Sequence, residues 1–332
     1  MTPGSSTARP FPRTARSSSS DAPSLGGEET GLSGPVFSWQ MVRMTQSRAT
    51  LIGFTAVLLW ALLALFTVGT APVPPLQLNA ICFAIGGVIG LVWVSATGGW
   101  ARLRAVPWTV YAFGTAGLFG YHFFYFSALR LAPAAEAGLI AYLWPLLIVL
   151  FSGLLPGERL RSGHIVGALV SFAGAALLLS RGSGGFSAEA LPGYIFAVLC
   201  ALTWSSYSVL SRRLGAMPTD TVAIYCVATA VLSAVAHLVV ETTTWPETGI
   251  GWVSVVALGL GPVGLAFYTW DVGVKRGNIQ LLGTASYAAP LLSTFVLIAF
   301  GVAQASPVLI LAAALITFGA FLAARAGRSP AR

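Results

Sequence analysis

The chain has 332 residues, of which 56% are apolar and only 8% are charged, and its mean hydropathy is +0.81. An ordinary soluble domain carries about 25% charged residues, so this chain has too little polar surface to cover a globule in water and is not a soluble enzyme. Its formal net charge of +8 would suggest nucleic acid as a partner, unless the positions of the basic residues have another explanation.

The sequence lacks the common motifs for catalysis. The only lysine, Lys275, is followed by Arg276, so there is no phosphate-binding loop of the Gly-Lys-Ser/Thr type. None of the three histidines is followed by glutamate, which excludes a zinc-protease helix. The three cysteines lie in apolar runs without the spacing of metal ligands. We therefore expect no enzymatic activity, no metal and no cofactor.

Residues 1–43 differ in composition from the rest of the chain. They are rich in serine, proline, glycine and arginine, include four consecutive serines at Ser17–Ser20, and show no periodic apolar pattern. Such a segment cannot bury enough apolar surface to fold, so we predict a disordered N-terminal tail.

From Ala49 onward the chain consists of apolar segments joined by short loops. A helix needs about 20 residues to cross a bilayer, and ten segments have close to that length. The sequence therefore predicts an all-α membrane protein with ten transmembrane helices. The predicted spans are 49–69, 76–96, 106–128, 135–155, 164–180, 192–211, 219–240, 250–271, 278–300 and 306–325.

The basic residues alternate between the loops. Lysine and arginine accumulate on the cytoplasmic side of membrane proteins. Thirteen of the 18 basic residues lie on one side of the ten spans, only Arg130 and Arg181 lie on the other, and three belong to the tail. This split predicts that both termini are cytoplasmic, and it explains the net charge without nucleic acid. The thirteen are Arg43, Arg48, Arg102, Arg104, Arg159, Arg161, Arg212, Arg213, Lys275, Arg276, Arg325, Arg328 and Arg332.

Three sequence features recur at nearly the same offset, which indicates duplication of a five-span unit. Because five is an odd number, the second unit, residues 182–332, is expected to lie upside down relative to the first, residues 44–181. Inverted repeats of this kind are typical of secondary transporters, whose substrate site lies at the midplane between the halves. The recurring features are Tyr142–Leu147 with Tyr287–Leu292, Phe124–Tyr125 with Phe267–Tyr268, and Trp60 with Trp204.

Aromatic residues at mid-span are the candidate substrate-binding residues. Most tryptophans, Trp270 included, lie near span ends, where an interfacial belt explains them. The remaining indole and phenol groups need polar partners at bilayer depth, and lining a cavity would supply them. The alternative is that these rings only pack between helices. The candidates are Tyr121, His122, Tyr125, Tyr142, Trp144, Trp204, Tyr207 and Tyr287.

Pro145 and Pro290 occupy matching places in the two predicted halves. A proline inside a helix frees a carbonyl group and kinks the chain, and in transporters such breaks expose backbone groups or act as hinges. We therefore predict hinges at both prolines, with a static kink as the alternative. Pro262 is expected to break span eight in a similar way.

Ionisable residues inside the predicted spans are few. His122 is the candidate for proton coupling, because a buried ionisable group in a membrane span is functional by default. Glu136 and Asp271 fall near predicted span ends, where we expect water to reach them. With no carboxylate at mid-span, the sequence favours facilitated diffusion over proton-driven pumping.

Several motifs resemble one known group of transporters. The ten short-looped spans resemble the drug/metabolite transporter superfamily, in its EamA-like branch, and the motifs look like those of bacterial aromatic amino acid exporters. The resemblance implies a carrier in the inner membrane with a central cavity between its halves. The motifs are Ala135–Gly138, Tyr142–Pro145, Trp270–Gly273, Gly277–Asn278, and Ser286–Tyr287 with Pro290.

The sequence and this resemblance together predict an exporter of aromatic and other neutral amino acids that works by alternating access. Its expected partners are the small-molecule substrate and membrane lipid, with no nucleic acid, and a monomer is the working expectation. Two alternatives stay open: an exporter of cationic drugs or other metabolites on the same scaffold, and a membrane receptor that does not transport.

Overall fold

A computed structural model describes residues 44–180, 185–302 and 304–328. The predicted tail, Arg181 and Arg332 lie outside the described residues. The described part is helical and contains no strand, as its composition predicts. The helices are α1 (Gln46–Ala61), α2 (Leu63–Gly69), α3 (Pro75–Ala96), α4 (Trp100–Arg104), α5 (Trp108–Leu131), α6 (Ala134–Ala141), α7 (Trp144–Ser152), α8 (Ser162–Leu179), α9 (Leu191–Arg213), α10 (Thr221–Val240), α11 (Gly249–Leu260), the π-helical turn η1 (Gly261–Leu265), α12 (Ala266–Arg276), α13 (Ile279–Ala285), α14 (Ala288–Ala299) and α15 (Pro307–Arg328).

Nine helical segments of the described chain are long and apolar enough to cross a membrane. They coincide with nine of the ten predicted spans to within a few residues at most ends. Helix α5, at the place of the remaining prediction, has 24 residues but is not among the nine. Its tryptophan, three tyrosines, histidine and arginine make it less apolar than the others.

Four of these segments depart from a regular α-helix, three by an interruption and one by a π-helical turn. The segment of α1 and α2 is interrupted at Leu62, although no proline lies there. The segment of α6 and α7 breaks before Pro145, and that of α13 and α14 breaks before Pro290. At Pro262 the helix is not broken but widens into the π-helical turn η1. The breaks predicted at Pro145 and Pro290 are therefore confirmed, whereas the break expected at Pro262 is a π-helical turn and the interruption at Leu62 was not predicted.

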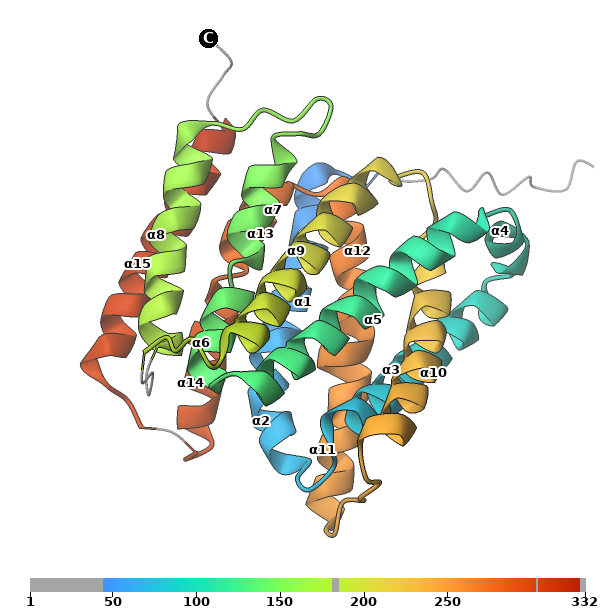
Figure 1. Ribbon diagram of the computed structural model, residues 1–332. Helices are drawn as coiled ribbons and strands as arrows, with labels where there is room; N and C mark the ends of the chain where they lie inside the picture. The colour runs from blue at the N-terminus through green and yellow to red at the C-terminus, as the bar shows by residue number, and fades with distance from the viewer. Residues whose placement is uncertain (1–43, 181–184, 303, 329–332) are drawn as a thin grey trace, which may run out of the picture. The chain divides into compact units, whose positions relative to one another are not determined.

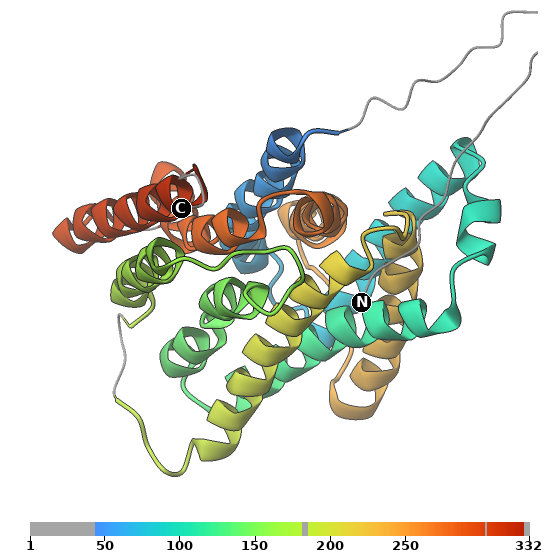
Figure 2. The same ribbon diagram turned by 90° about the horizontal axis from the view of Figure 1, so that it is seen from above.

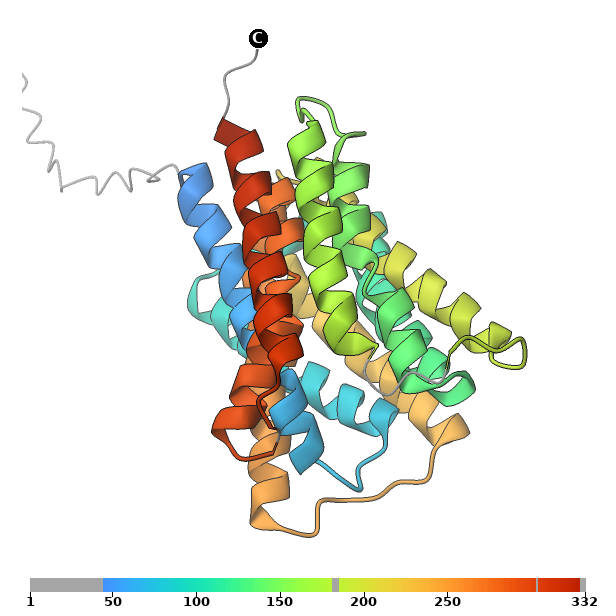
Figure 3. The ribbon, with the colours of Figure 1, turned by 90° about the vertical axis from the view of Figure 1, so that its left-hand side faces the viewer.

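The helices form two groups joined by α1 and α9 (Figure 1). The α8–α15 group contains α6, α7, α8, α13, α14 and α15, and the α3–α10 group contains α3, α5, α10, α11 and α12. Figure 2 shows the two groups on opposite sides when the molecule is seen from above. Helices α8 and α15 run side by side in Figure 3, and each is the other's main packing partner.

Small residues allow close helix contacts within and between these groups. A Cβ atom on Gly53 of α1 would lie 2.7 Å from the Cα atom of Gly273 in α12, so these two helices touch backbone to backbone. A Cβ atom on Gly174 of α8 would lie 2.9 Å from the Ala312 carbonyl oxygen of α15. Packing through small residues is the usual means of joining helices in membranes, where the hydrophobic effect does not drive them together.

The two ends of the bundle differ in charge. One end, which we call the arginine-rich end, carries the start of α8 and the ends of α9 and α12, with Arg161, Arg212 and Arg276. The other, which we call the Glu241 end, carries the end of α5 with Arg130 and the end of α10 with Glu241. The functional argument below depends on what lies between these ends.

Candidate functional site

Four tryptophans meet between the two helix groups. Trp60 of α1, Trp144 of α7, Trp204 of α9 and Trp270 of α12 form a cluster in which all pairs of ring centroids lie 5.1 to 6.4 Å apart. These distances are typical of favourable edge-to-face and offset-stacked ring contacts. We call these four residues the tryptophan cluster. It joins both helix groups to the two helices between them.

The predicted substrate-binding residues all connect to this cluster. Tyr121 contacts Trp204 at 5.2 Å between ring centroids, and Tyr207 stacks on Trp204 at 5.3 Å. Tyr142 lies 6.1 Å from Trp144 and 6.3 Å from Tyr287. The other two are joined through Tyr121, which lies 5.0 Å from His122 and 6.2 Å from Tyr125. The structure therefore brings all eight predicted residues into one aromatic network, while their role in binding stays a prediction.

The members of this network differ in accessibility. Trp144, Trp204, Tyr207 and Tyr287 are buried, with at most 4% of their surface exposed. Tyr121, His122, Tyr125 and Tyr142 keep an intermediate exposure. We call these four partly exposed rings the exposed face of the aromatic network.

Trp270 is a member that the sequence analysis assigned wrongly. It was expected in an interfacial belt, but it is fully buried, and its indole N–H donates to the Ser208 hydroxyl at 3.1 Å. The predicted span ended at residue 271 because charged residues follow, whereas the helix continues to Arg276. This extension moves Trp270 away from the helix end. By contrast, Trp93 and Trp108 are exposed near helix ends, as expected.

Pro145 and Pro290 lie at the two helix breaks, beside the aromatic network. Pro145 is the second residue of α7, directly after Trp144, and Pro290 is the third residue of α14, close to Tyr287. A proline has no N–H group to donate to the carbonyl four residues earlier, which is a sufficient reason for each break. Whether the breaks act as hinges stays a prediction.

Asp271 and Glu136 are buried, contrary to expectation. Asp271 forms an ion pair with Lys275 at 2.9 Å and accepts a hydrogen bond from the Thr219 hydroxyl at 2.8 Å. Glu136, in the first turn of α6, accepts from the Gly185 N–H at 3.1 Å. Proximity to a span end therefore did not imply contact with water, because neighbouring loops cover both side chains.

At the arginine-rich end, Arg212 connects the two helix groups. Its guanidinium donates to the Val274 carbonyl at 3.0 Å and to the Gly277 carbonyl at 2.8 Å, both at the end of α12. It also forms an ion pair with Glu158 in the loop between α7 and α8. The same carboxylate accepts from the Gln280 amide of α13 at 2.9 Å. Arg212 thus holds the end of α12 against the α8–α15 group.

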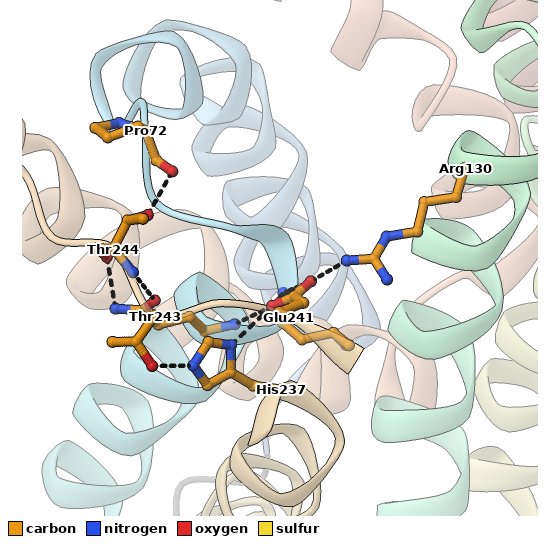
Figure 4. Close-up of polar contacts among 8 residues, drawn as sticks. Pro72, Arg130, His237, Glu241, Thr243 and Thr244 are labelled. Carbon is orange, nitrogen blue, oxygen red and sulfur yellow. Dashed lines mark hydrogen bonds and ion pairs between the residues drawn. The ribbon is translucent and has the colours of Figure 1, made fainter. Parts of the chain in front are cut away.

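At the Glu241 end, a polar cluster lies within the α3–α10 group alone (Figure 4). The Glu241 carboxylate accepts from the backbone N–H groups of Leu76 and Gln77, at 3.0 and 3.1 Å, and so caps the start of α3. It also forms an ion pair with Arg130 of α5 and a hydrogen bond with the His237 ring of α10. The cluster therefore fixes α3, α5 and α10 to one another. Sequence reasoning did not identify it, and the only signal was an acidic residue four positions after a histidine.

Comparisons with known proteins agree with this architecture. A model of the EamA-like transporter family matches residues 47–180 and 191–325. The aromatic amino acid exporter YddG of Ancylobacter novellus is 56% identical over 282 residues, which cover 84% of this chain and 98% of that protein. The Escherichia coli protein of the same name is 24% identical over 265 residues, or 76% of this chain and 88% of that protein.

A solved crystal structure of another protein also resembles this fold. It superposes with a TM-score of 0.82 at 55% sequence identity, and the match covers 86% of this chain and all of that chain. The similarity therefore extends over most of the described chain.

Proposed function

Because the chain belongs to the EamA-like transporter family, we propose that this multi-pass membrane protein exports aromatic and other neutral amino acids across a bacterial inner membrane. The observation that carries the proposal is the aromatic network between the two helix groups. Flat aromatic faces suit an aromatic side chain by stacking and an ammonium group by cation–π attraction. The named function of the relatives supports the choice of amino acids.

We assign α5, the third long helical segment along the chain, as a membrane span, which brings the number of spans to ten. Its 24 residues are enough to cross a bilayer, and two of its tyrosines contact neighbouring segments. Tyr111 donates to the Leu103 carbonyl at 2.7 Å, and Tyr121 contacts Trp204. Polar side chains that point into the bundle are compatible with a spanning helix.

The packing of the helices supports an inverted repeat of five plus five spans. Numbering the spans along the chain, α1 is part of the first span and packs on α12 of the eighth, and α5 of the third packs on α9 of the sixth. Exchanging the two halves converts one of these pairs into the other. The pairs α3–α10 and α8–α15, from spans two and seven and spans five and ten, each convert into themselves. This pattern is what two-fold symmetry between the halves requires.

Alternating access follows from the two helix groups. The α8–α15 group rocks against the α3–α10 group, with Pro145 and Pro290 as the hinges of its broken helices. The arginine-rich end is the cytoplasmic one, because lysine and arginine accumulate there. The Arg212–Glu158 contact closes this end, so the exposed face of the aromatic network belongs to a state that opens toward the Glu241 end. Transport is facilitated diffusion, with His122 as the site to test for proton coupling.

A flux measurement tests this function. Liposomes that contain the purified protein are loaded with labelled phenylalanine, leucine or glutamine, and they should release phenylalanine fastest. Liposomes without the protein, loaded in the same way, should retain all three amino acids. Trp204→Ala should lower the rate at least tenfold, because it removes the ring at the centre of the network. Trp108→Ala, at an exposed position, is the matched control and should not change the rate.

Two outcomes would contradict the proposal. If liposomes with the protein released amino acids no faster than liposomes without it, an amino acid exporter would be excluded. Competition by quaternary amines without competition by amino acids would assign the same site to cationic drugs instead.

A further inference from the structure

The break between α6 and α7 is held by a side chain from the other half of the chain. The Leu146 N–H donates to the Tyr287 hydroxyl oxygen at 3.0 Å. In a continuous helix this N–H would donate to the Tyr142 carbonyl, four residues earlier. The first helical bond of α7 instead runs from the Leu147 N–H to the Leu143 carbonyl. Tyr287 therefore takes the donor that Tyr142 would otherwise use.

Pro145 removes a second helical donor at the same place. It has no N–H group, so the carbonyl of Ala141 lacks its usual partner as well. Two successive carbonyl groups at the break have thus lost their helical hydrogen bonds. A carbonyl group without a hydrogen-bond donor at membrane depth is costly in free energy. A helix break with two such carbonyl groups is therefore stable where a ligand or water donates to them.

Of these two residues, only Tyr142 keeps exposed surface. Ala141 is buried, whereas Tyr142 keeps an intermediate exposure and lies on the exposed face of the aromatic network. That face consists of Tyr121, His122, Tyr125 and Tyr142, and none of them carries a carboxylate. An amino acid bound there would need another acceptor for its ammonium group, and a backbone carbonyl can provide one.

We infer that Tyr287 is a positioning residue that holds the Leu146 N–H away from Tyr142, so that the Tyr142 carbonyl accepts a hydrogen bond from the substrate ammonium group. Tyr287 itself is fully buried and acts only through the break. This inference rests on the proposed transport of amino acids, and it specifies which part of the substrate is recognised.

The test compares two ligands that differ in the ammonium group. Labelled phenylalanine bound to the full-length protein in liposomes is displaced with unlabelled phenylalanine or with 3-phenylpropionate, which has the same ring and carboxylate but no ammonium group. The wild-type protein should bind 3-phenylpropionate at least tenfold more weakly than phenylalanine. In Tyr287→Phe the Leu146 N–H returns to the Tyr142 carbonyl, so the affinity for phenylalanine should fall about tenfold while that for 3-phenylpropionate changes less than twofold.

Tyr194→Phe is the matched control, because the Tyr194 hydroxyl also accepts a backbone N–H, from Ser187 at 3.3 Å, and lies away from the aromatic network. It should leave the ratio of the two affinities unchanged. Equal binding of both ligands by the wild-type protein would overturn the inference, even if Tyr287→Phe did not fold. So would a parallel loss of both affinities in Tyr287→Phe, which would indicate a purely structural role. Failure of the wild-type protein to bind phenylalanine at all would overturn the proposed function instead.

Discussion

Asp271 and Lys275 place two opposite charges inside a candidate membrane-spanning segment. Both side chains are almost fully buried, and they lie 2.9 Å apart, one helical turn from each other. Lys275 also donates to the Met217 carbonyl at 3.3 Å, and Asp271 accepts from Thr219. The pair therefore connects α12 to the loop that precedes α10. Its charges neutralise each other, so its main effect is on stability rather than on net charge in the membrane.

Removing one member of this pair should be costly. Asp271→Asn leaves the Lys275 ammonium buried without its counter-charge, and such a change destabilises proteins by about 3–5 kcal/mol. We expect a marked fall in the thermal unfolding temperature of the detergent-solubilised protein. The neutral double variant Asp271→Asn/Lys275→Met should recover most of that loss. An unchanged unfolding temperature in the single variant would contradict a stabilising role for the pair.

At this scale the sequence predicted which residue types matter better than it predicted their depth. The eight candidate residues were chosen because they lie within predicted spans and away from the interfacial belt, and they form one network. The burial of Trp270 and Asp271 was missed because the prediction ended span eight at its first charged residue. A charge that is paired does not end a helix in a membrane, and the sequence does not show the pairing.

Among the elements, the loop between α7 and α8 has the clearest mechanical role. Through Glu158 it holds Arg212, which is itself fixed to two carbonyls at the end of α12. The Glu158 and Arg212 side chains are 17% and 19% exposed, so water reaches the contact and it can open reversibly. In the proposed cycle this contact must break each time the cytoplasmic side opens.

Glu158→Gln should therefore favour the state that is open to the cytoplasm. Ile148 lies one turn beyond Trp144 in α7 and is fully buried. A cysteine introduced at this position, in a variant without the three native cysteines, should react with a thiol reagent only when the cytoplasmic side opens. Since a partly exposed ion pair contributes up to about 1 kcal/mol, we expect Glu158→Gln to raise the rate of thiol labelling at Ile148→Cys about fivefold.

The matched control for that experiment is Asp220→Asn. It removes another ion pair at the same end, between Arg102 and Asp220 at 2.6 Å, but both residues belong to segments beside the α3–α10 group. Labelling at Ile148→Cys should not change in this control. Equal acceleration by both variants would mean that general loosening, and not the contact between groups, exposes the site.

The helix breaks show where element-level prediction ends. Proline chemistry was enough to locate the breaks near Pro145 and Pro290, because a missing N–H group is a local property. The hydrogen bond from Leu146 to Tyr287 joins residues 141 positions apart, and no local pattern encodes it. The interruption at Leu62 has no proline and was not predicted.

For the whole molecule, the unequal distribution of basic residues fixes the expected orientation. Thiol labelling of intact cells with a membrane-impermeant reagent, in the cysteine-free background, measures it. Glu247→Cys, exposed between α10 and α11, should be labelled from outside. Arg104→Cys, exposed at the end of α4, should be labelled only after the membrane is permeabilised. The reverse pattern would contradict the orientation on which the transport direction depends.

The overall architecture was largely accessible from the sequence, because membrane spans are set by length and apolarity alone. Nine candidate spans of the described chain coincide with predicted ones, and the EamA-like family model matches two segments, 47–180 and 191–325. The grouping of helices was not accessible, since the α8–α15 and α3–α10 groups each combine spans from both halves. Only contacts between distant segments define these groups.

The tryptophan cluster has one consequence of a different kind. Its four indoles are close enough for their electronic transitions to couple, so the cluster should dominate the near-ultraviolet circular dichroism of the protein. Because the four rings come from helices of both groups and from the two helices between them, rocking of the groups would change the angles between the transition dipoles. The protein thus contains an intrinsic optical reporter of its own conformational cycle, which requires no attached label.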